Sequence, residues 1–480
     1  MTKTPTQISY QKIGTNRGNP RLWIEGVKLG AAGFTRGARY TISFFDGKMK
    51  LTLDPEGHRA VSGKTRHGRD IPILDITLKE LEQHFDPESR VRVVFTQGCI
   101  SVSLHHETAA QQDREARFAD SLRAKSLSEA SMFSGGGIST HAIHKAISDH
   151  GHNSKLAWVV DAELRYLQSG FANSFAIDDN TTALIGRAEE IETAFFRPVD
   201  ILSFSMPCSG FSRAGKSKHG HNPEAHEGAA ALFGTMNAIR AANPAVLISE
   251  NVVEAQSSPA YVLLKAEIER LGYVVFERVM DASDTGSTEN RRRYWFVALS
   301  KGIADGFSFD MIHEACASPR RAISELLQED VPESAWAENQ YLKDKAIRDA
   351  KDGKGFARQL LTGSETSCGT IGRHYMKRRS TEPFLVREDG KERLFTPVEH
   401  ARMKSVPEEL IDGVAPTVAH EILGQSIDYR QAYLAMAQIM SHVTDYVTKG
   451  IKNTAKSVTA MDEITPKPDT KSPAMQLRLI

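Results

Sequence analysis

The residues best suited to chemistry stand at the ends of short apolar runs. Cys208 follows Pro207 just after the run DILSF, and Glu250 ends the run AVLISE. A cysteine thiolate is a nucleophile, and a neighbouring carboxyl group can hold or protonate a substrate ring. Arg291 and Arg293 lie further on, in ENRRRYW, and supply permanent positive charge. Together these residues indicate covalent catalysis, although a cysteine taken alone is more often a buried structural residue.

A glycine loop and two acids indicate a site for a nucleoside. The loop FSGGGIST begins at Phe133, between the strand-like run ASMF and a helical stretch. Its glycines let a ligand approach the backbone, and the helix N-terminus offers free N–H groups. Asp161 ends the next run, LAWVV, and Asp178 ends the run SFAI, which we expect to be the third strand. Acids at strand ends suit ribose hydroxyls and repel pyrophosphate, although a purely structural glycine turn remains the alternative.

Strand-like and helical stretches alternate from Glu129 to about Gly302. This alternation predicts an α/β fold with a mainly parallel sheet and helices on both faces. The carboxyl ends of parallel strands meet at one edge of such a sheet, where these folds hold their ligands. We therefore expect the glycine loop, the two acids, Cys208 and Glu250 to gather at that edge.

The segment before this core, residues 20–104, is strand-like and internally repeated. Related units begin at Pro20 and Pro72, and each reads as a strand, a short helix and two strands around an Asp-Gly or Gln-Gly turn. Two such units can bury one small core together. The first unit also resembles the SymE-like, AbrB-related swapped-hairpin barrels, some of which bind DNA. A structural or protein-contact module is the alternative.

Composition limits the class of protein. The chain has 480 residues, and its 60 basic and 60 acidic residues give zero formal net charge. Zero charge excludes binding to nucleic acid through bulk charge alone, but leaves room for a local basic groove. The four cysteines lack any Cys-x-x-Cys pair, which argues against a disulfide framework or a structural zinc site. The N-terminus is not a signal peptide and no apolar run could span a membrane, so we expect a cytoplasmic protein.

Six motifs between residues 129 and 442, in the order that the family has them, resemble the cytosine-C5 DNA methyltransferases. The motifs are FSGGG, PCSGFSRAG, ENV, ENRRRYW, RLFTPVEHAR and GQSI. The resemblance implies a Rossmann-like fold dependent on S-adenosylmethionine, with duplex DNA as substrate and no metal. It also implies a catalytic core (129–302), a target-recognition region (303–390) and C-terminal motifs that return to the core (391–447). The sequence pattern outside these motifs predicts a flexible lead (1–19), the β-rich module (20–104), a linker helix (105–128) and a mobile tail (448–480).

The resemblance assigns roles to the chemical residues. The Cys208 thiolate attacks cytosine C6, and Glu250 holds the ring at N3 and the exocyclic amine. Arg293 pairs with the cytosine carbonyl oxygen, while Arg291 braces the nucleophile loop or the base. Pro207 fixes the cysteine and lines the cofactor side. The residues expected around the cofactor are Phe133, Gly135, Gly137, Asp161, Asp178, Pro207, Leu232, Gln425 and Ser426. Simple helix packing is the alternative for Leu232, and Asp179 is the competing register for Asp178.

Basic residues in two places could hold the DNA. Arg213 and Lys216 lie in the loop that follows Cys208, and three further cations lie in GRHYMKRRS: Arg373, Lys377 and Arg378. Arginine and lysine suit phosphates and guanine edges, although a solvated basic turn is the alternative. Three histidines of the first loop, His219, His221 and His226, lack the cysteine or carboxylate spacing of a metal site, so a solvated loop or phosphate contact is the better interpretation.

Four departures from the family pattern leave the four chemical residues intact: Ala162, Ser209, Glu289 and Gln425. We therefore expect an active, monomeric enzyme that works in restriction-modification, with a cognate endonuclease as partner, or alone as a prophage-type enzyme. The alternatives are a tRNA-directed relative, which would carry a Cys-Phe-Thr element, and an inactive DNA-binding regulator.

Overall fold

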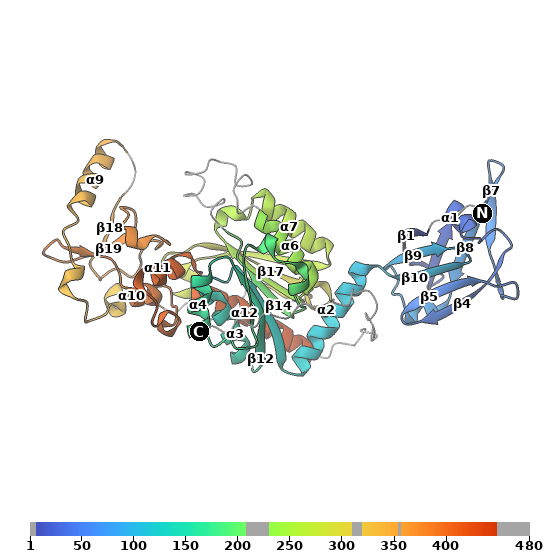
Figure 1. Ribbon diagram of the computed structural model, residues 1–480, viewed down its shortest axis with the longest axis horizontal. Helices are drawn as coiled ribbons and strands as arrows, with labels where there is room; N and C mark the ends of the chain where they lie inside the picture. Colours follow the sequence, from blue (N-terminus) through green and yellow to red (C-terminus); the bar gives the residue numbers. More distant parts are fainter. Residues whose placement is uncertain (1–5, 208–229, 310–318, 354–356, 449–480) are drawn as a thin grey trace, which may run out of the picture. The chain divides into compact units, whose positions relative to one another are not determined.

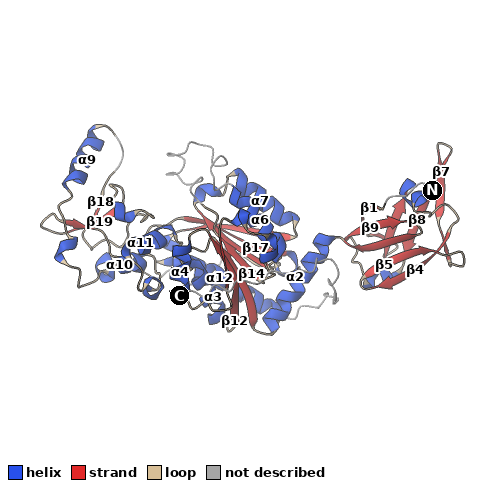
Figure 2. Ribbon diagram, in the orientation of Figure 1, coloured by secondary structure: helices blue, strands red, loops and turns tan. Residues whose placement is uncertain are grey.

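The computed structural model describes residues 6–207, 230–309, 319–353 and 357–448 (Figures 1 and 2). The chain divides into two compact units, one before and one after the boundary between Asp113 and Arg114. No helix within the described residues combines the length and apolarity needed to cross a bilayer.

The first unit consists of two antiparallel sheets around one core. One sheet has the strand order β1-β9-β10-β5-β4-β6 and the other the order β2-β3-β8-β7. Their elements are β1 (Gln7–Lys12), β2 (Gly14–Asn16), β3 (Asn19–Glu25), α1 (Val27–Ala31), β4 (Arg39–Phe45), β5 (Lys48–Leu53), β6 (Arg59–Ala60), β7 (Ser62–Arg66), β8 (Arg69–Thr77), the 3-10 helix η1 (Lys79–Gln83), β9 (Arg90–Thr96) and β10 (Cys99–Leu104). The expected order of strand, short helix and hairpin is confirmed in both repeats.

The two repeats are interlocked around a pseudo-two-fold axis. Leu22 pairs with Ile76 and Ile24 pairs with Leu74, so β3 meets its own counterpart, β8, in a symmetric register. β5 meets β10 in the same way. β1, which precedes the first repeat, pairs with β9 of the second, and β6, which precedes the second repeat, pairs with β4 of the first. Apolar side chains from both repeats therefore form one buried cluster.

The second unit is built on a seven-stranded sheet of order β13-β12-β11-β14-β15-β17-β16. β13, β12, β11, β14 and β15 pair in parallel. β17 lies between β15 and β16 and runs antiparallel to both, so β16 points in the same direction as the first five. The strands are β11 (Ser126–Met132), β12 (Asn153–Asp161), β13 (Thr182–Ile185), β14 (Ile201–Phe204), β15 (Val246–Asn251), β16 (Tyr273–Met280) and β17 (Arg293–Ser300). The expected mainly parallel α/β fold is confirmed.

Helices cover both faces of this sheet. They are α2 (His106–Arg123), α3 (Ile138–Asp149), α4 (Leu164–Asn173), α6 (Ala231–Ala242), α7 (Pro259–Arg270), α8 (Ala282–Thr285), α10 (Pro397–Met403), α11 (Pro416–Gln425) and α12 (Tyr429–Thr448). On one face α2, α3, α11 and α12 share a core with Val297 and Leu299. On the other face α6 and α7 pack against Phe296 and Ala298. Alternate residues of β17 thus point into opposite cores, as strand geometry requires.

One expected strand is wrong. Residues 174–177, SFAI, form a turn between α4 and β13, and the third strand is β13. Ala176 is buried, and the Ile177 side chain lies next to Gly170. The apolar run therefore packs as a turn, because apolar content signals burial and does not by itself specify a strand.

The segment after the sheet folds around a small core of its own. It contains α9 (Gln340–Lys351), β18 (Gln359–Leu361), β19 (Pro383–Val386) and β20 (Glu392–Arg393), with the strand order β18-β19-β20. Its buried cluster includes Ile323, Ile371 and Tyr375. Glu382 is only 6% exposed beside this cluster. Burial raises the pKa of the Glu382 carboxyl to about 7, and the charge of Arg379 opposes that rise.

We expect Glu382→Gln to flatten the pH dependence of stability. Between the ordinary glutamate pKa and about 7 the folded chain holds a proton that the unfolded chain has lost. The free energy of unfolding therefore falls as pH rises through that window. The variant should melt a few degrees above the parent at pH 8 and at the same temperature below pH 4.5. Thermal melts across this pH range measure the effect, with exposed Glu329→Gln as the control. A Glu382→Gln variant whose melting temperature followed the parent curve, as the control should, would contradict the account.

Candidate active site

The chemical residues gather where the parallel strands end. Phe133 follows β11, Asp161 ends β12, Ser205 follows β14 and Glu250 lies at the end of β15. β17 is antiparallel, so its first residue, Arg293, lies at this same edge. The glycine loop, Asp161 and Glu250 therefore lie at the ends of parallel strands, as expected. The expectation is wrong for Asp178, which lies in the turn before β13, and Cys208 lies outside the described residues.

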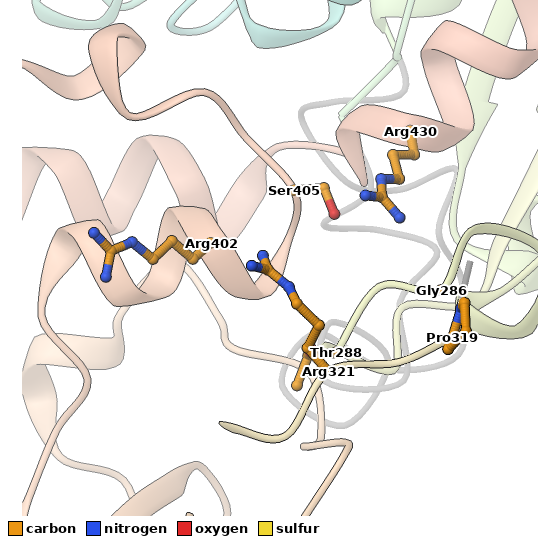
Figure 3. A pocket seen from close by; sticks show the side chains of 7 residues that line it. All are labelled: Gly286, Thr288, Pro319, Arg321, Arg402, Ser405 and Arg430. Atoms are coloured by element: carbon orange, nitrogen blue, oxygen red, sulfur yellow. The ribbon is translucent and has the colours of Figure 1, made fainter. Parts of the chain in front are cut away.

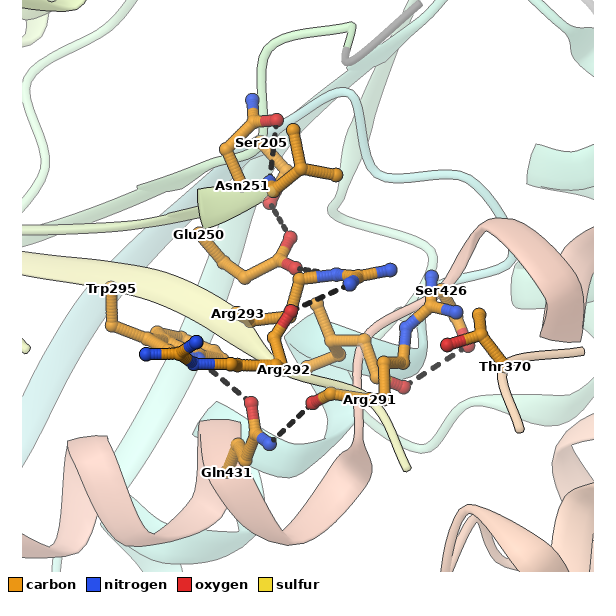
Figure 4. A network of polar contacts seen from close by, with 12 residues as sticks. Ser205, Glu250, Asn251, Arg291, Arg292, Arg293, Trp295, Thr370, Ser426 and Gln431 are labelled. Carbon is orange, nitrogen blue, oxygen red and sulfur yellow. Dashed lines mark hydrogen bonds and ion pairs between the residues drawn. The ribbon is translucent and has the colours of Figure 1, made fainter. Parts of the chain in front are cut away.

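An ion pair joins Glu250 to Arg293 at the centre of this edge (Figure 4). Arg293 Nε lies 2.8 Å from Glu250 Oε1, and the two side chains are 13% and 10% exposed. Ser205 Oγ donates a long hydrogen bond of 3.5 Å to the other carboxylate oxygen. A nearly buried charge pair is held in a fixed orientation and interacts more strongly than it would in water. The pair is thus suited to holding a flat polar ring.

Asn251 fixes the backbone just before the predicted nucleophile. Its Nδ2 donates to the carbonyl oxygen of Met206 at 2.8 Å and to the Tyr261 hydroxyl at 2.8 Å. Pro207 follows Met206 and is exposed. The expected residues Cys208, Ser209, Arg213 and Lys216, and the three histidines of the same loop, lie outside the described residues.

The glycine loop has the backbone of a ligand-binding turn. Phe133 has a φ of 58°, and Gly135 and Gly137 have φ values of 55° and 77°. Positive φ at a bulky residue such as Phe133 stores strain and is concentrated at functional sites. A Cβ on Gly135 would meet open space, so this face of the loop is accessible.

Asp161 is tied directly to this loop. Its Oδ2 accepts the Gly135 amide at 2.7 Å and its Oδ1 accepts the Glu163 amide at 2.9 Å. Burial raises the pKa of the Asp161 carboxyl, and these amide hydrogen bonds oppose that rise. A carboxylate held against an accessible glycine turn can accept hydrogen bonds from ribose hydroxyls. These residues therefore fit a nucleoside cofactor.

The last motif packs against the glycine loop and against the recognition segment. A Cβ on Gly136 would lie 2.5 Å from Ile422 of α11. A Cβ on Gly424 would lie 2.4 Å from the carbonyl of Gly372. Only glycine fits at either position without a backbone shift. Gln425 and Ser426 follow directly, where α11 ends, and α12 begins at Tyr429.

Arg291 joins the arginine motif to this last motif. Its guanidinium is buried and donates to Glu289 Oε1 at 3.2 Å and to the Gly424 carbonyl oxygen at 3.3 Å. Glu289, one of the four departures, is 1% exposed and forms an ion pair with Arg291. Exchanging the family's glutamine for glutamate thus adds a charge that the neighbouring arginine balances.

Lys404 is a site residue that sequence reasoning missed. It is fully buried, and its Nζ donates to the carbonyl oxygens of Leu423 and Ser426 and to Ser426 Oγ at 2.9 Å. The Leu423 carbonyl lies in the last turn of α11, where carbonyls lack partners within the helix. Burial and the charge of Arg291 lower the pKa of Lys404 well below its ordinary value. No local sequence signal marks this role, because Lys404 stands between Met403 and Ser405 in a segment of mixed polarity.

The surroundings of four other cofactor candidates support a cofactor role less directly. Asp178 is exposed in the turn before β13, where its carboxylate accepts the Asn180 amide at 2.8 Å. The residues at the carboxyl end of β13 are Gly186 and Arg187. Leu232 belongs to the core cluster around α6, which agrees with simple helix packing. Gln425 is exposed, and Ser426 is half-buried.

The predicted DNA-binding cations of the recognition segment differ in their surroundings. Arg373 donates to the Tyr166 hydroxyl at 2.8 Å and lies 5.6 Å above the centre of that ring. Arg378 lies 5.9 Å from the centre of the Phe384 ring. Lys377 is exposed. Of the three predicted cations, Lys377 is therefore the most available to an external phosphate.

A small basic pocket lies beside the segment that precedes β17 (Figure 3). Its volume is about 110 Å³, which is too small for a nucleoside. It is lined by Gly286, Thr288, Pro319, Arg321, Arg402, Ser405 and Arg430. Figure 3 shows Arg430 pointing toward Ser405 and Arg402 pointing away from the pocket. Arg402 Nε donates to Glu408 Oε1 at 2.6 Å. The cofactor residues described above lie elsewhere.

Comparison with known proteins identifies the second unit. A family model described as C-5 cytosine-specific DNA methylase matches residues 127–440, about two thirds of the chain. The chain belongs to this family. It is 26% identical to the type II methyltransferase M.SsoII of Shigella sonnei over 242 residues, covering 48% of this chain and 60% of that protein. It is 27% identical to M.NlaX of Neisseria lactamica over 236 residues, with 48% and 72% covered.

The chain therefore spans about 60% of the length of the first two curated relatives.

Solved structures agree on the fold. The Dnmt2 methyltransferase of S. pombe superposes with a TM-score of 0.52 at 17% identity, covering 67% of this chain and 99% of that one. The methyltransferase EhMeth of Entamoeba histolytica superposes with a TM-score of 0.53 at 16% identity over the same shares.

Proposed function

We propose that this chain transfers a methyl group from S-adenosylmethionine to C5 of a cytosine flipped out of duplex DNA. The observation that carries the proposal is the Glu250–Arg293 pair, fixed 2.8 Å apart beside the strand that leads into Pro207-Cys208. Family membership supports the reaction class.

The chain's residues divide the chemistry among them. Cytosine C5 is a poor nucleophile, so the Cys208 thiolate first bonds to C6 and pushes electron density onto C5. Glu250 holds N3 and the exocyclic amine, and Arg293 holds the carbonyl oxygen. S-adenosylmethionine supplies an electrophilic methyl group. Loss of the C5 proton then restores the double bond and releases Cys208. The base must leave the helix to reach this edge, because its reacting atoms are covered inside a duplex.

The cofactor lies, in this proposal, along the glycine loop. Phe133, Gly135 and Gly137 let it approach the backbone, and Asp161 receives its ribose hydroxyls. Asp161 is a stronger candidate than Asp178, because it is tied to Gly135 and ends a strand. Pro207, Leu232, Gln425 and Ser426 would line the rest of the pocket.

The DNA contacts remain a proposal for Arg213, Lys216, Arg373, Lys377 and Arg378. The exposed position of Lys377 supports its inclusion. The relatives are named type II methyltransferases, which supports a place in restriction-modification, with an endonuclease as partner. We propose a cytoplasmic monomer.

Transfer of a labelled methyl group tests the reaction directly. The full chain is incubated with labelled S-adenosylmethionine and either duplex DNA or tRNA, and the digested nucleosides are separated. We expect 5-methylcytosine from DNA, its loss in Cys208→Ser, and its retention in Cys99→Ser, because Cys99 belongs to the first unit. Label in tRNA alone would favour the tRNA-directed relative. DNA binding without any transfer would favour the inactive regulator.

We expect Lys404→Met to weaken binding of S-adenosylmethionine about tenfold, equivalent to about 1.4 kcal/mol. The variant keeps an unbranched side chain of similar size but removes the ammonium donor from the carbonyls of Leu423 and Ser426 and from Ser426 Oγ. Lys404→Gln retains an N–H donor and should recover part of the affinity. Calorimetry with S-adenosylmethionine alone measures the effect.

Exposed Lys301→Met serves as the control for charge loss elsewhere in the same unit. A folded Lys404→Met protein that binds S-adenosylmethionine as tightly as the parent would show that Lys404 does not position the cofactor residues. The affinity for DNA should change less than that for the cofactor.

A further inference from the structure

The first unit carries a concentrated patch of positive charge. Residues 59–69 contain Arg59, Lys64, Arg66 and Arg69 and no Asp or Glu, in a chain with zero formal net charge. This stretch covers β6, β7 and the start of β8. A local excess of this size attracts anions even when the whole chain is neutral.

The patch lies on a two-stranded ribbon that extends from the sheet β2-β3-β8-β7 (Figure 1). His67 and Gly68 form its two-residue turn with φ values of 50° and 72°, as a type I′ hairpin requires. Residues 64–70 are all exposed. Side chains alternate along strands, so Lys64, Arg66 and Arg69 lie on one face of the ribbon.

The pseudo-symmetric counterpart shows that the core does not need this extension. β2 and β3 form the equivalent ribbon around Arg17-Gly18, with φ values of 49° and 83°. β2 has three residues, whereas β7 has five. The two extra cross-strand pairs beside the turn are Thr65–Asp70 and Arg66–Arg69, and none of these residues is buried. The shared core therefore does not need these residues in order to fold.

The positive charges at the end of the ribbon repel each other when no ligand is bound. Arg66 lies directly across from Arg69 in the register of the two strands. Like charges in opposite positions destabilise a hairpin. The direct ion pairs of the nearby acids go to other cations: Asp70 pairs with Arg36 at 3.2 Å, and Glu25 pairs with Lys64 at 2.9 Å. Glu25 interacts with Arg66 only through the weaker field of its charge. An external anion would relieve the repulsion between the two arginines.

We propose that the end of this ribbon, residues 64–70, is a second DNA-binding element that contacts the phosphates of duplex DNA. The choice of duplex DNA rests on the function proposed above, and the charge and shape are complementary to it. The major groove is about 12 Å wide and admits a two-stranded β-ribbon, with guanidinium groups reaching the phosphates on its borders. β7 is also an edge strand, so its outer backbone N–H groups point away from the sheet.

The salt dependence of binding tests this element. The full chain is titrated onto a fluorescent duplex of A·T pairs, which holds no cytosine for the catalytic edge. Each lost phosphate contact lowers the slope of log K against log salt by about 0.9. We expect Arg66→Gln/Arg69→Gln to lower this slope by about 1.8 and to weaken binding. The control Lys48→Gln/Lys50→Gln changes two exposed cations of the other sheet and should leave the slope unchanged.

Equal slopes for the parent and the arginine variant would overturn the proposal, as would an equal loss in the control. An RNA hairpin that competes better than duplex DNA would overturn the assignment to DNA. Methyl transfer to a short cytosine-containing duplex separates the two proposals, because the arginine variant should keep the parent turnover number. A parent that transfers no methyl group, yet shows the slope difference, would contradict the proposed function and leave the ribbon's role supported.

Discussion

The direction of one strand determines what this edge can do. β17 runs antiparallel to β15, in a register that places Tyr294 opposite Asn251 and Trp295 opposite Glu250. Its first residue, Arg293, therefore begins at the carboxyl edge of the parallel strands and meets Glu250 at 2.8 Å. Had this eight-residue strand been parallel, its arginine would lie at the opposite edge, about 25 Å away. The ion pair, and with it a fixed polar cradle for a base, depends on this reversal.

Contacts from the same segment extend to the proposed cofactor side. Arg291 donates to the carbonyl of Gly424, and buried Lys404 holds the turn that follows through Leu423 and Ser426. Gly136 of the glycine loop packs against α11 from the other side. The Glu250–Arg293 pair, proposed to hold the base, and the glycine loop, proposed to hold the cofactor, are thus linked by buried contacts, so a shift in either would be felt by the other.

The sequence indicated most of this site, because its residues sit at strand ends and in motifs of fixed local geometry. The strand YVVFERVM, for example, is Tyr273–Met280. SFAI was mistaken for a strand, because a short buried turn has the same apolar content. The role of Lys404 was not predictable, since it depends on how α10 and α11 meet in three dimensions. The repeat in residues 20–104 was visible, but the exchange of β1 and β6 between repeats depends on long-range register.

The central claim is that Cys208 bonds covalently to cytosine during methyl transfer. It is tested most directly with a DNA duplex that carries 5-fluorocytosine, because fluorine at C5 blocks the final loss of a proton. With S-adenosylmethionine present, the account predicts a protein–DNA adduct that survives denaturation. Mass spectrometry of its peptides should place the link on Cys208. A link to another residue, or ready methylation of ordinary DNA with no adduct on the fluorinated duplex, would contradict it.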